Sequence, residues 1–290
     1  MNYHIMDLEW NNAFSCRHGK FVNEIIEIGA VRLNDALEHQ DEFSQLIKPR
    51  LSGRLSSIVK NLTSITMDEL GEGVPFAEAV NRLGKWMGEE EHVVLTWSDT
   101  DLHVLLENFK KFLNKRHIPF LQKYADLQKY LQHRLEIPGG NQIALANAAG
   151  QLEIDLTGRD MHRALDDSRV CAEMLKTVFE KESFAGFTAD ARRPDFYRRL
   201  TFKNRYITDV KNPGINKNDL RFTCERCGKY AKRMSRWAVR NKSLSAVFCC
   251  GSCGHMFRGN VRIKKTFDET VVTRSVFPYE LPKEGSSDDK

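Results

Sequence analysis

The sequence predicts an α/β domain, with a sheet flanked by helices, followed by a small β-rich domain built around a metal. Strand-like runs come first and then alternate with helical segments, as in sheet domains covered by helices. Charge divides the chain, because residues 1–183 hold 21 basic and 28 acidic residues and residues 184–290 hold 23 and 11. The two parts therefore carry net charges of −7 and +12, and five of the seven cysteines lie in the second.

Length and composition set the broad class of protein. A chain of 290 residues favours two domains, and 29% charged with 41% hydrophobic residues is typical of a folded, water-soluble protein. No apolar run approaches the ~20 residues needed to span a bilayer, so we expect no membrane. The N-terminus lacks a basic stretch followed by an apolar one, which predicts no signal peptide and a cytoplasmic location. Cysteines in that reducing compartment are free, metal-bound or catalytic.

The elements of the first domain follow from apolar spacing. The runs typical of strands are residues 3–10, 25–33, 43–48 and 92–97. The segments with helical spacing are 76–87, about 101–114, 126–135, 141–150 and 162–180. This alternation predicts that the first domain covers residues 1–183.

The remainder of the chain has a different character. Residues 184–220 are basic and irregular, and they contain the loop signal Asn212-Pro213-Gly214, so we expect a linker. The β-like runs Ser245–Phe248 and Thr270–Val276 belong to a domain at 221–282. Residues 283–290 are polar and predict a disordered tail.

Acidic residues at element ends predict a cation site in the first domain. Asp7 and Glu9 lie two apart on a strand, which places both carboxylates on one face. Asp101 lies where strand 92–97 gives way to a helix. On the last helix Asp167 shares the apolar face, whereas Asp166 faces outward. Clustered inward carboxylates need compensation, and all-oxygen ligands favour Mg²⁺ or Mn²⁺.

These residues resemble the motifs of the DEDD exonucleases. Asp7-Leu8-Glu9 looks like the first motif, residues 96–102 resemble the second, and residues 162–167 resemble the third in its histidine (DEDDh) form. Asn61-Leu62-Thr63-Ser64-Ile65-Thr66 is similar to a segment that follows the third strand in that family. Trp97 resembles the KapD-like and Eri-type branch, which acts largely on RNA. One departure is Trp10-Asn11-Asn12 after Glu9, where a small or hydroxyl residue is usual.

The resemblance implies a ribonuclease-H-like mixed sheet and 3′→5′ exonuclease activity. It assigns two Mg²⁺ or Mn²⁺ ions to Asp7, Glu9, Asp101 and Asp167, with His162 as the general base. Single-stranded RNA or an RNA 3′ overhang is the favoured substrate. A DNA exonuclease and a catalytically silent, nucleic-acid-binding adaptor remain as alternatives, and Asp99 could instead cap the helix that follows it.

Two Cys-x-x-Cys-Gly knuckles predict a structural zinc site in the second domain. Cys224 and Cys227 form the first knuckle, and Cys250 and Cys253 form the second after a gap of 22 residues. Four thiolates close a tetrahedral site that holds one structural Zn²⁺. Cys249 could replace Cys250, and His255 is the other conceivable ligand.

The zinc domain looks like a zinc ribbon, and its basic and aromatic residues predict contact with nucleic acid. Cations neutralise phosphates, and aromatic faces stack on unpaired bases. Trp237 and Phe257 could equally belong to the core of the ribbon. The expected nucleic-acid-binding residues are Lys232, Arg233, Arg236, Trp237, Arg258, Arg262, Lys264 and Lys265.

Overall fold

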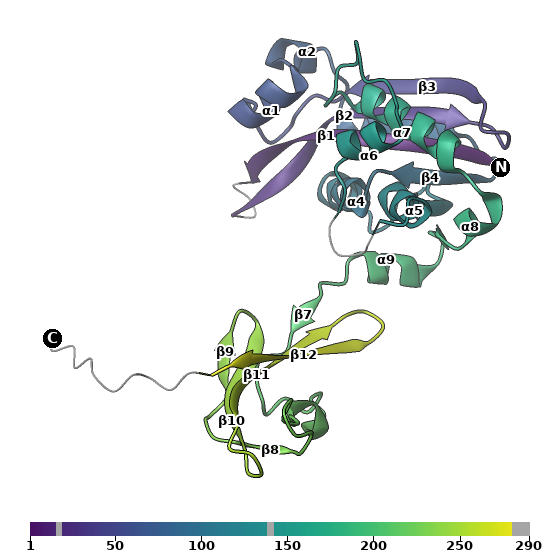
Figure 1. The fold of residues 1–290 in the computed structure, drawn as a ribbon. Coiled ribbons are helices and arrows are strands. Elements are labelled where there is room, and N and C mark those ends of the chain that lie inside the picture. Colours follow the sequence, from purple (N-terminus) through teal and green to yellow (C-terminus); the bar gives the residue numbers. More distant parts are fainter. Residues whose placement is uncertain (16–18, 138–141, 280–290) are drawn as a thin grey trace. The chain divides into compact units, whose positions relative to one another are not determined.

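The structure of the chain, a computed structural model, describes residues 1–15, 19–137 and 142–279 (Figure 1). It divides into two compact units, Met1–Leu200 and Thr201–Lys290, which are described separately. The tail expected at 283–290 and the first residue of the helix expected at 141–150 lie outside the described residues. Within those residues, no helix combines the length and the apolar character needed to cross a membrane.

A six-stranded mixed sheet forms the centre of the first unit, in the order β3-β2-β1-β4-β5-β6 (Figure 1). β1, β4 and β5 are parallel, and β2, β3 and β6 are antiparallel to their neighbours. All four predicted strands are present, with the first two longer than predicted and the third beginning earlier. The strands are β1 (Asn2–Ser15), β2 (Lys20–Leu33), β3 (His39–Leu46), β4 (His92–Thr96), β5 (Lys123–Asp126) and β6 (Thr188–Asp190).

The five predicted helical segments form helices, and the described residues contain four further short helices. The five predicted helices are α3 (Phe76–Met87), α4 (Asp99–Leu113), α5 (Leu127–Arg134), α6 (Leu145–Gln151) and α7 (Ala164–Val178). The additional helices are α1 (Ser57–Thr63), α2 (Met67–Gly71), α8 (Lys181–Ala185) and α9 (Pro194–Leu200). Because α7 begins two residues later than predicted, His162 lies in the turn before it.

The sheet carries a separate hydrophobic layer on each face. Met6 and Leu8 of β1 pack in a layer with side chains of α3 and α4. Tyr3 and Ile5 pack in the opposite layer with side chains of α5, α6 and α7. Since successive strand residues point to opposite faces, Asp7 and Glu9 share the face of Tyr3, which α7 covers.

The hairpin of β1 and β2 is longer than the sequence pattern indicates. The strand predicted at 3–10 continues past Asn11, which is polar yet buried. Its amide donates to the carbonyl of Arg54, and its oxygen accepts from the N–H of Ser56. A polar side chain satisfied in this way continues the strand without loss.

Residues 184–220, expected as a linker, are divided between the two units. Phe184 and Ala191 are buried in the first unit and β6 joins its sheet, so this unit extends to Leu200 rather than to residue 183. Residues 201–220 give the second unit β7 (Arg205–Tyr206) and a 3-10 helix (Lys217–Leu220). The composition therefore becomes basic near residue 184, whereas the fold changes only after Leu200.

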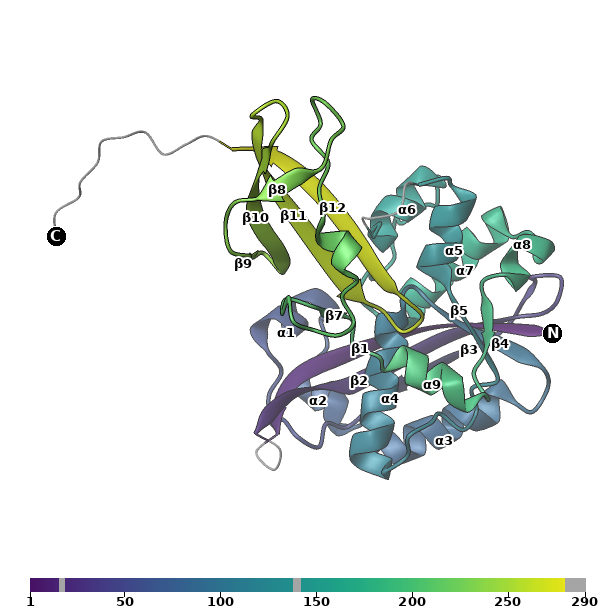
Figure 2. The ribbon, with the colours of Figure 1, turned by 90° about the horizontal axis from the view of Figure 1, so that it is seen from below.

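The second unit is a small antiparallel sheet around its own core (Figure 2). β12, β11, β10 and β8 are neighbours in that order, with β9 beside β10 and β7 beside β11. The inward side chains include Phe222, Phe248, Phe257 and Val261. The strands are β8 (Ala231–Arg233), β9 (Ala238–Arg240), β10 (Ser243–Cys250), β11 (Met256–Lys265) and β12 (Thr270–Pro278).

Candidate active site and zinc centre

Three carboxylates meet between β1 and α7. One oxygen from each of Asp7, Glu9 and Asp167 lies within 4.8 Å of the others. Alternation along β1 supplies the first two, and the inward face of α7 supplies the third, as the sequence predicts. Asp166 faces away from them, because its carboxylate accepts from Arg169 at 2.8 Å.

Gly29 of β2 makes this meeting possible. It is paired with Asp7 in the antiparallel ladder. A Cβ built on it would stand 2.1 Å from the backbone nitrogen of Leu165, so α7 rests directly on the glycine. The hydroxyl of Ser168 donates to the Gly29 carbonyl at 3.1 Å and fixes that contact. A side chain at position 29 would therefore push Asp167 away from Asp7.

Asp101 stands beside the three carboxylates without joining their close group. β4 pairs with β1 only as far as Ile5, and the N–H of Leu8, farther along β1, donates to the Asp101 carboxylate. The charge of Asp101 is the strongest electrostatic influence on Asp7. Ser98, and not Asp99, caps α4, because the Ser98 hydroxyl accepts from the N–H of Thr100.

Burial and neighbouring negative charges raise the pKa of all four acids. Burial is the largest cause for each, and for Asp7 the charges of the other three add to it. The pKa of Glu9 rises to about 8, and that of Asp101 rises to about 7 although backbone N–H donors oppose the shift. Clustered carboxylates repel one another when all are ionised, and divalent cations bound among them offset that repulsion.

The donors present fit a hard divalent cation. All are carboxylate oxygens, which Mg²⁺ and Mn²⁺ prefer. The Oδ1 atom of Asp167 is buried and has no hydrogen-bond partner among the described residues. Burying an anionic oxygen without a hydrogen-bond partner costs free energy, and a bound cation would offset that cost.

His162 lies next to Asp167, in the turn before α7. Its backbone adopts the left-handed region, with φ of 70°, which is uncommon for a residue with a side chain. Its N–H donates to the Asp167 carboxylate, and its imidazole charge lowers the pKa of that acid. The ring is exposed. The turn thus places His162 next to Asp167, the acid of the same sequence motif.

An ion pair that the sequence analysis missed holds this turn in place. Arg163 donates to the carboxylate of Glu27, with a shortest distance of 2.7 Å, and the N–H of Ala164 donates to the same carboxylate. Glu27 is only 1% exposed and pairs with Glu9 in the ladder. The signal available in the sequence was an acidic residue inside the apolar run at 25–33.

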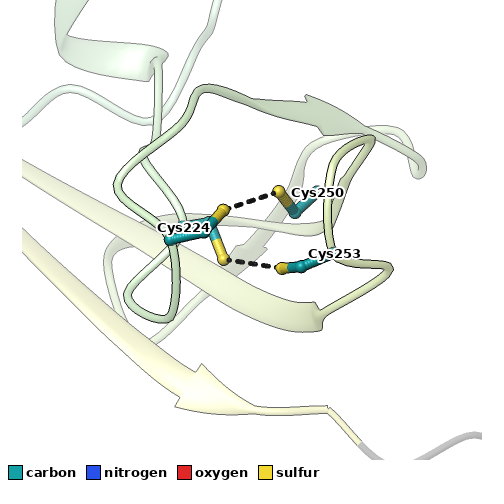
Figure 3. A group of neighbouring side chains, drawn as sticks. Cys224, Cys250 and Cys253 are labelled. Carbon is teal, nitrogen blue, oxygen red and sulfur yellow. Dashed lines mark hydrogen bonds between the residues drawn. The ribbon is translucent and has the colours of Figure 1, made fainter.

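The four knuckle cysteines come together in the second unit (Figure 3). Their sulfur atoms all lie within 4.8 Å of one another, with Cys224 and Cys253 3.6 Å apart and Cys227 and Cys250 3.3 Å apart. Backbone N–H groups of Cys253 and Ser252 lower the pKa of Cys250 to about 6, whereas burial and hydrogen bonds with the neighbouring thiols raise that of Cys253 to about 12. The thiolate that a metal requires is therefore favoured at Cys250.

The two knuckles repeat one backbone pattern. Gly228 donates to the carbonyl of Cys224 and Gly254 to that of Cys250, at 2.8 and 2.9 Å. Both glycines have positive φ, which the tight turn requires. The two alternative ligands lie outside the group: the sulfur of Cys249 lies 3.9 Å from two backbone carbonyls, and the His255 ring stacks on Phe257. Closed Cys₄ geometry fits Zn²⁺.

The expected nucleic-acid-binding residues are spread over several strands. Lys232 and Arg233 lie in β8, Arg236 and Trp237 precede β9, and the other four lie in β11. Trp237 packs partly buried against Phe248, under the guanidinium of Arg233. Phe257 is fully buried. Both aromatic rings therefore contribute to the core of the second unit.

Residues 5–175 match the RNase_T exonuclease family. The 3′-5′ exoribonuclease 1 of Mus musculus is 28% identical over 176 residues, which cover 57% of this chain and 50% of that protein. The Bacillus subtilis protein named "Probable 3'-5' exonuclease KapD" is 27% identical over 164 residues, covering 57% of this chain and 77% of the other. The chain spans about half the length of the first curated relatives that it matches.

A solved structure shares the fold of the first unit. The nuclease domain of 3′hExo, described as a DEDDh family member bound to rAMP, aligns with a TM-score of 0.52 and 28% identity. The alignment covers 60% of this chain and 90% of that one. It identifies the first unit as a nuclease-type α/β fold.

Proposed function

Because this chain belongs to the RNase_T exonuclease family, we propose that it is a metal-dependent 3′→5′ exonuclease that hydrolyses phosphodiester bonds. The observation that carries the proposal is the group formed by Asp7, Glu9 and Asp167, in which the buried Oδ1 of Asp167 has no hydrogen-bond partner among the described residues. A non-catalytic adaptor has no use for carboxylates held at this electrostatic cost.

In this proposal Asp7, Glu9, Asp101 and Asp167 hold two Mg²⁺ or Mn²⁺ ions. When bound, the ions supply Lewis acidity at the scissile phosphate. His162 accepts the proton of the attacking water, a task that suits an exposed imidazole. Glu27 and Arg163 keep the histidine turn against the acids.

Single-stranded RNA is the proposed substrate, and the name exoribonuclease that relatives carry supports RNA over DNA. The ribbon, held by one Zn²⁺, retains the strand through its basic residues. None of the six cysteines among the described residues forms a disulfide, which is compatible with a reducing compartment that we take to be the cytoplasm. A DNA exonuclease is the alternative with the same chemistry.

The test uses purified protein with Mg²⁺ or Mn²⁺ and single-stranded RNA and DNA of one sequence. A 5′ label should give a descending ladder, and a 3′ label should release a labelled mononucleotide at once. The reverse pattern contradicts the polarity, and a ladder on DNA alone changes the substrate. Retained binding without any product would make the first unit an adaptor.

A further inference from the structure

We propose that the outer face of the ribbon sheet is a binding platform for single-stranded nucleic acid. This face is defined by the strand residues that point away from the core of Phe248, Phe257 and Val261. The inference rests on the proposed function for its choice of ligand. From the sequence alone, the basic residues of the second unit form one set. The strand registers divide them between the outer face of the sheet and its reverse side.

The strand registers place five cations on this outer face. Along β11, buried residues alternate with Arg258, Arg262 and Lys264. Lys232 of β8 is paired with Cys249, and Arg240 of β9 is paired with Ser243, which both point outward from β10. Paired residues in an antiparallel sheet share a face, so all five cations lie on one surface.

No carboxylate of the described residues pairs with the charges of this surface. By register, no strand residue on the outer face is Asp or Glu. Among the described residues, none of the five cations lies within 4.0 Å of a carboxylate oxygen, and Arg262 donates only to the neutral oxygens of Ser243 and Asn241. Such a patch of free positive charge is the electrostatic footprint of a polyanion site.

Aromatic rings lie among the cations. Tyr206 is paired with Lys264, and the cationic groups of Lys242 and Arg262 lie 5.3 and 5.9 Å from the centre of its ring. Phe277, 48% exposed, is paired with Arg258. The half-buried ring of Tyr206 and the exposed ring of Phe277 beside unpaired cations favour unpaired bases stacked along a charged backbone, whereas a duplex would hide its base faces.

The reverse side of the same sheet supplies a matched control. Arg205 of β7 is paired with Lys265, and Arg233 is paired with the inward-facing Phe248. These three residues have the same side-chain types as Arg258, Arg262 and Lys264 but the opposite orientation. Exchanging either set for glutamine removes three charges from one sheet.

The experiment measures fluorescence anisotropy of a single-stranded RNA and a DNA of the same sequence, in the full chain carrying Asp101→Asn to prevent cleavage. Arg258→Gln, Arg262→Gln and Lys264→Gln together should weaken binding at least about tenfold and reduce the salt slope by about 2, as three lost phosphate contacts predict. The reverse-side triple should change affinity less than threefold. Zinc content and melting temperature confirm that both variants are folded.

A second variant tests the stacking contribution. Tyr206→Leu with Phe277→Leu should weaken single-strand binding and leave the salt slope unchanged, because no charge is removed. Equal losses from the two triples, or unchanged affinity in the outer-face triple, would overturn the platform, and tighter binding of duplex would overturn its single-strand preference. Binding is measured without cleavage, so failure of the nuclease proposal leaves this result readable.

Discussion

The α-carbon of Gly29 lies against the backbone of Leu165, so that a Cβ built on Gly29 would stand 2.1 Å from the nitrogen of that residue. Gly29 is also the ladder partner of Asp7. One glycine therefore sets the distance between the acid on the central strand and the acid on α7.

Gly29→Ala should move α7 and separate Asp167 from Asp7. We expect exonuclease rates to fall by about 100-fold, the cost of a displacement of about 1 Å in a catalytic group. Overpacking should also lower the free energy of unfolding by about 1–3 kcal/mol. Gly150→Ala is the matched control, because its Cβ meets nothing within 4 Å and lies in α6, where alanine is preferred. Wild-type rates in Gly29→Ala would contradict this account.

Arg163→Met should release the histidine turn. Glu27 is left as a buried charge without its partner, which costs about 3 kcal/mol, at the low end for buried pairs because Arg163 is itself 30% exposed. Chemical denaturation measures the loss, and Glu27→Gln added to the variant should recover part of it. Arg169→Met, which breaks a more exposed pair with Glu42, should cost about 1 kcal/mol or less. Equal costs for the two would argue against a special role of Arg163.

The raised pKa values predict how stability depends on pH without added Mg²⁺ or Mn²⁺. The folded pKa of Asp101, about 7, exceeds its ordinary value of 3.8, so the folded state holds the proton longer than the unfolded state. Stability is therefore lost as pH rises from about 4 to about 7. The Asp101→Asn variant lacks this titrating group. The melting temperature of the variant, relative to that of the wild type, should therefore increase as pH rises from about 4 to about 7.

Adding Mn²⁺ should reverse the trend, because the cation binds the deprotonated carboxylates. The increase in melting temperature should be larger at pH 8 than at pH 5. No chelator is used, so that the cysteine site keeps its metal. A difference between wild type and Asp101→Asn that does not change with pH would contradict the raised pKa.

Removal of one knuckle thiol should unfold the ribbon. Cys253→Ser should lower the zinc content from one per chain to none and abolish the cooperative melting of the second unit, since so small a core depends on its metal. Cys249→Ser is the control beside the site and should retain one zinc. Zinc is measured by elemental analysis. Loss of zinc in Cys249→Ser with retention in Cys253→Ser would reassign the ligands.

The sequence could predict features that depend on local spacing. Two-residue alternation placed Asp7 and Glu9 on one face, and helical spacing distinguished Asp167 from Asp166. The cysteine knuckles were equally local. These predictions hold because strand and helix geometry alone decides them.

Features that depend on contact between distant segments could not be predicted in this way. The pair of Glu27 and Arg163 joins residues 136 positions apart, and the need for Gly29 arises only when α7 lies on it. The division of the ribbon's cations into two faces depends on strand register. The prediction of a linker at 184–220 was wrong for the same reason. Tertiary packing places residues 184–200 in the first unit although this segment is basic and irregular in composition.

The most direct test of the account compares Asp167→Asn with Asp166→Asn. Both remove one acid from the same turn of α7, but only Asp167 faces Asp7 and Glu9. With Mn²⁺ and 5′-labelled single-stranded RNA, Asp167→Asn should lose at least about 1,000-fold in cleavage rate, in line with loss of a catalytic charge stabiliser. Asp166→Asn should stay within about tenfold of the wild type, a loss of about 1.4 kcal/mol or less. Comparable rates for the two variants, with both folded, would contradict the assignment of the active site.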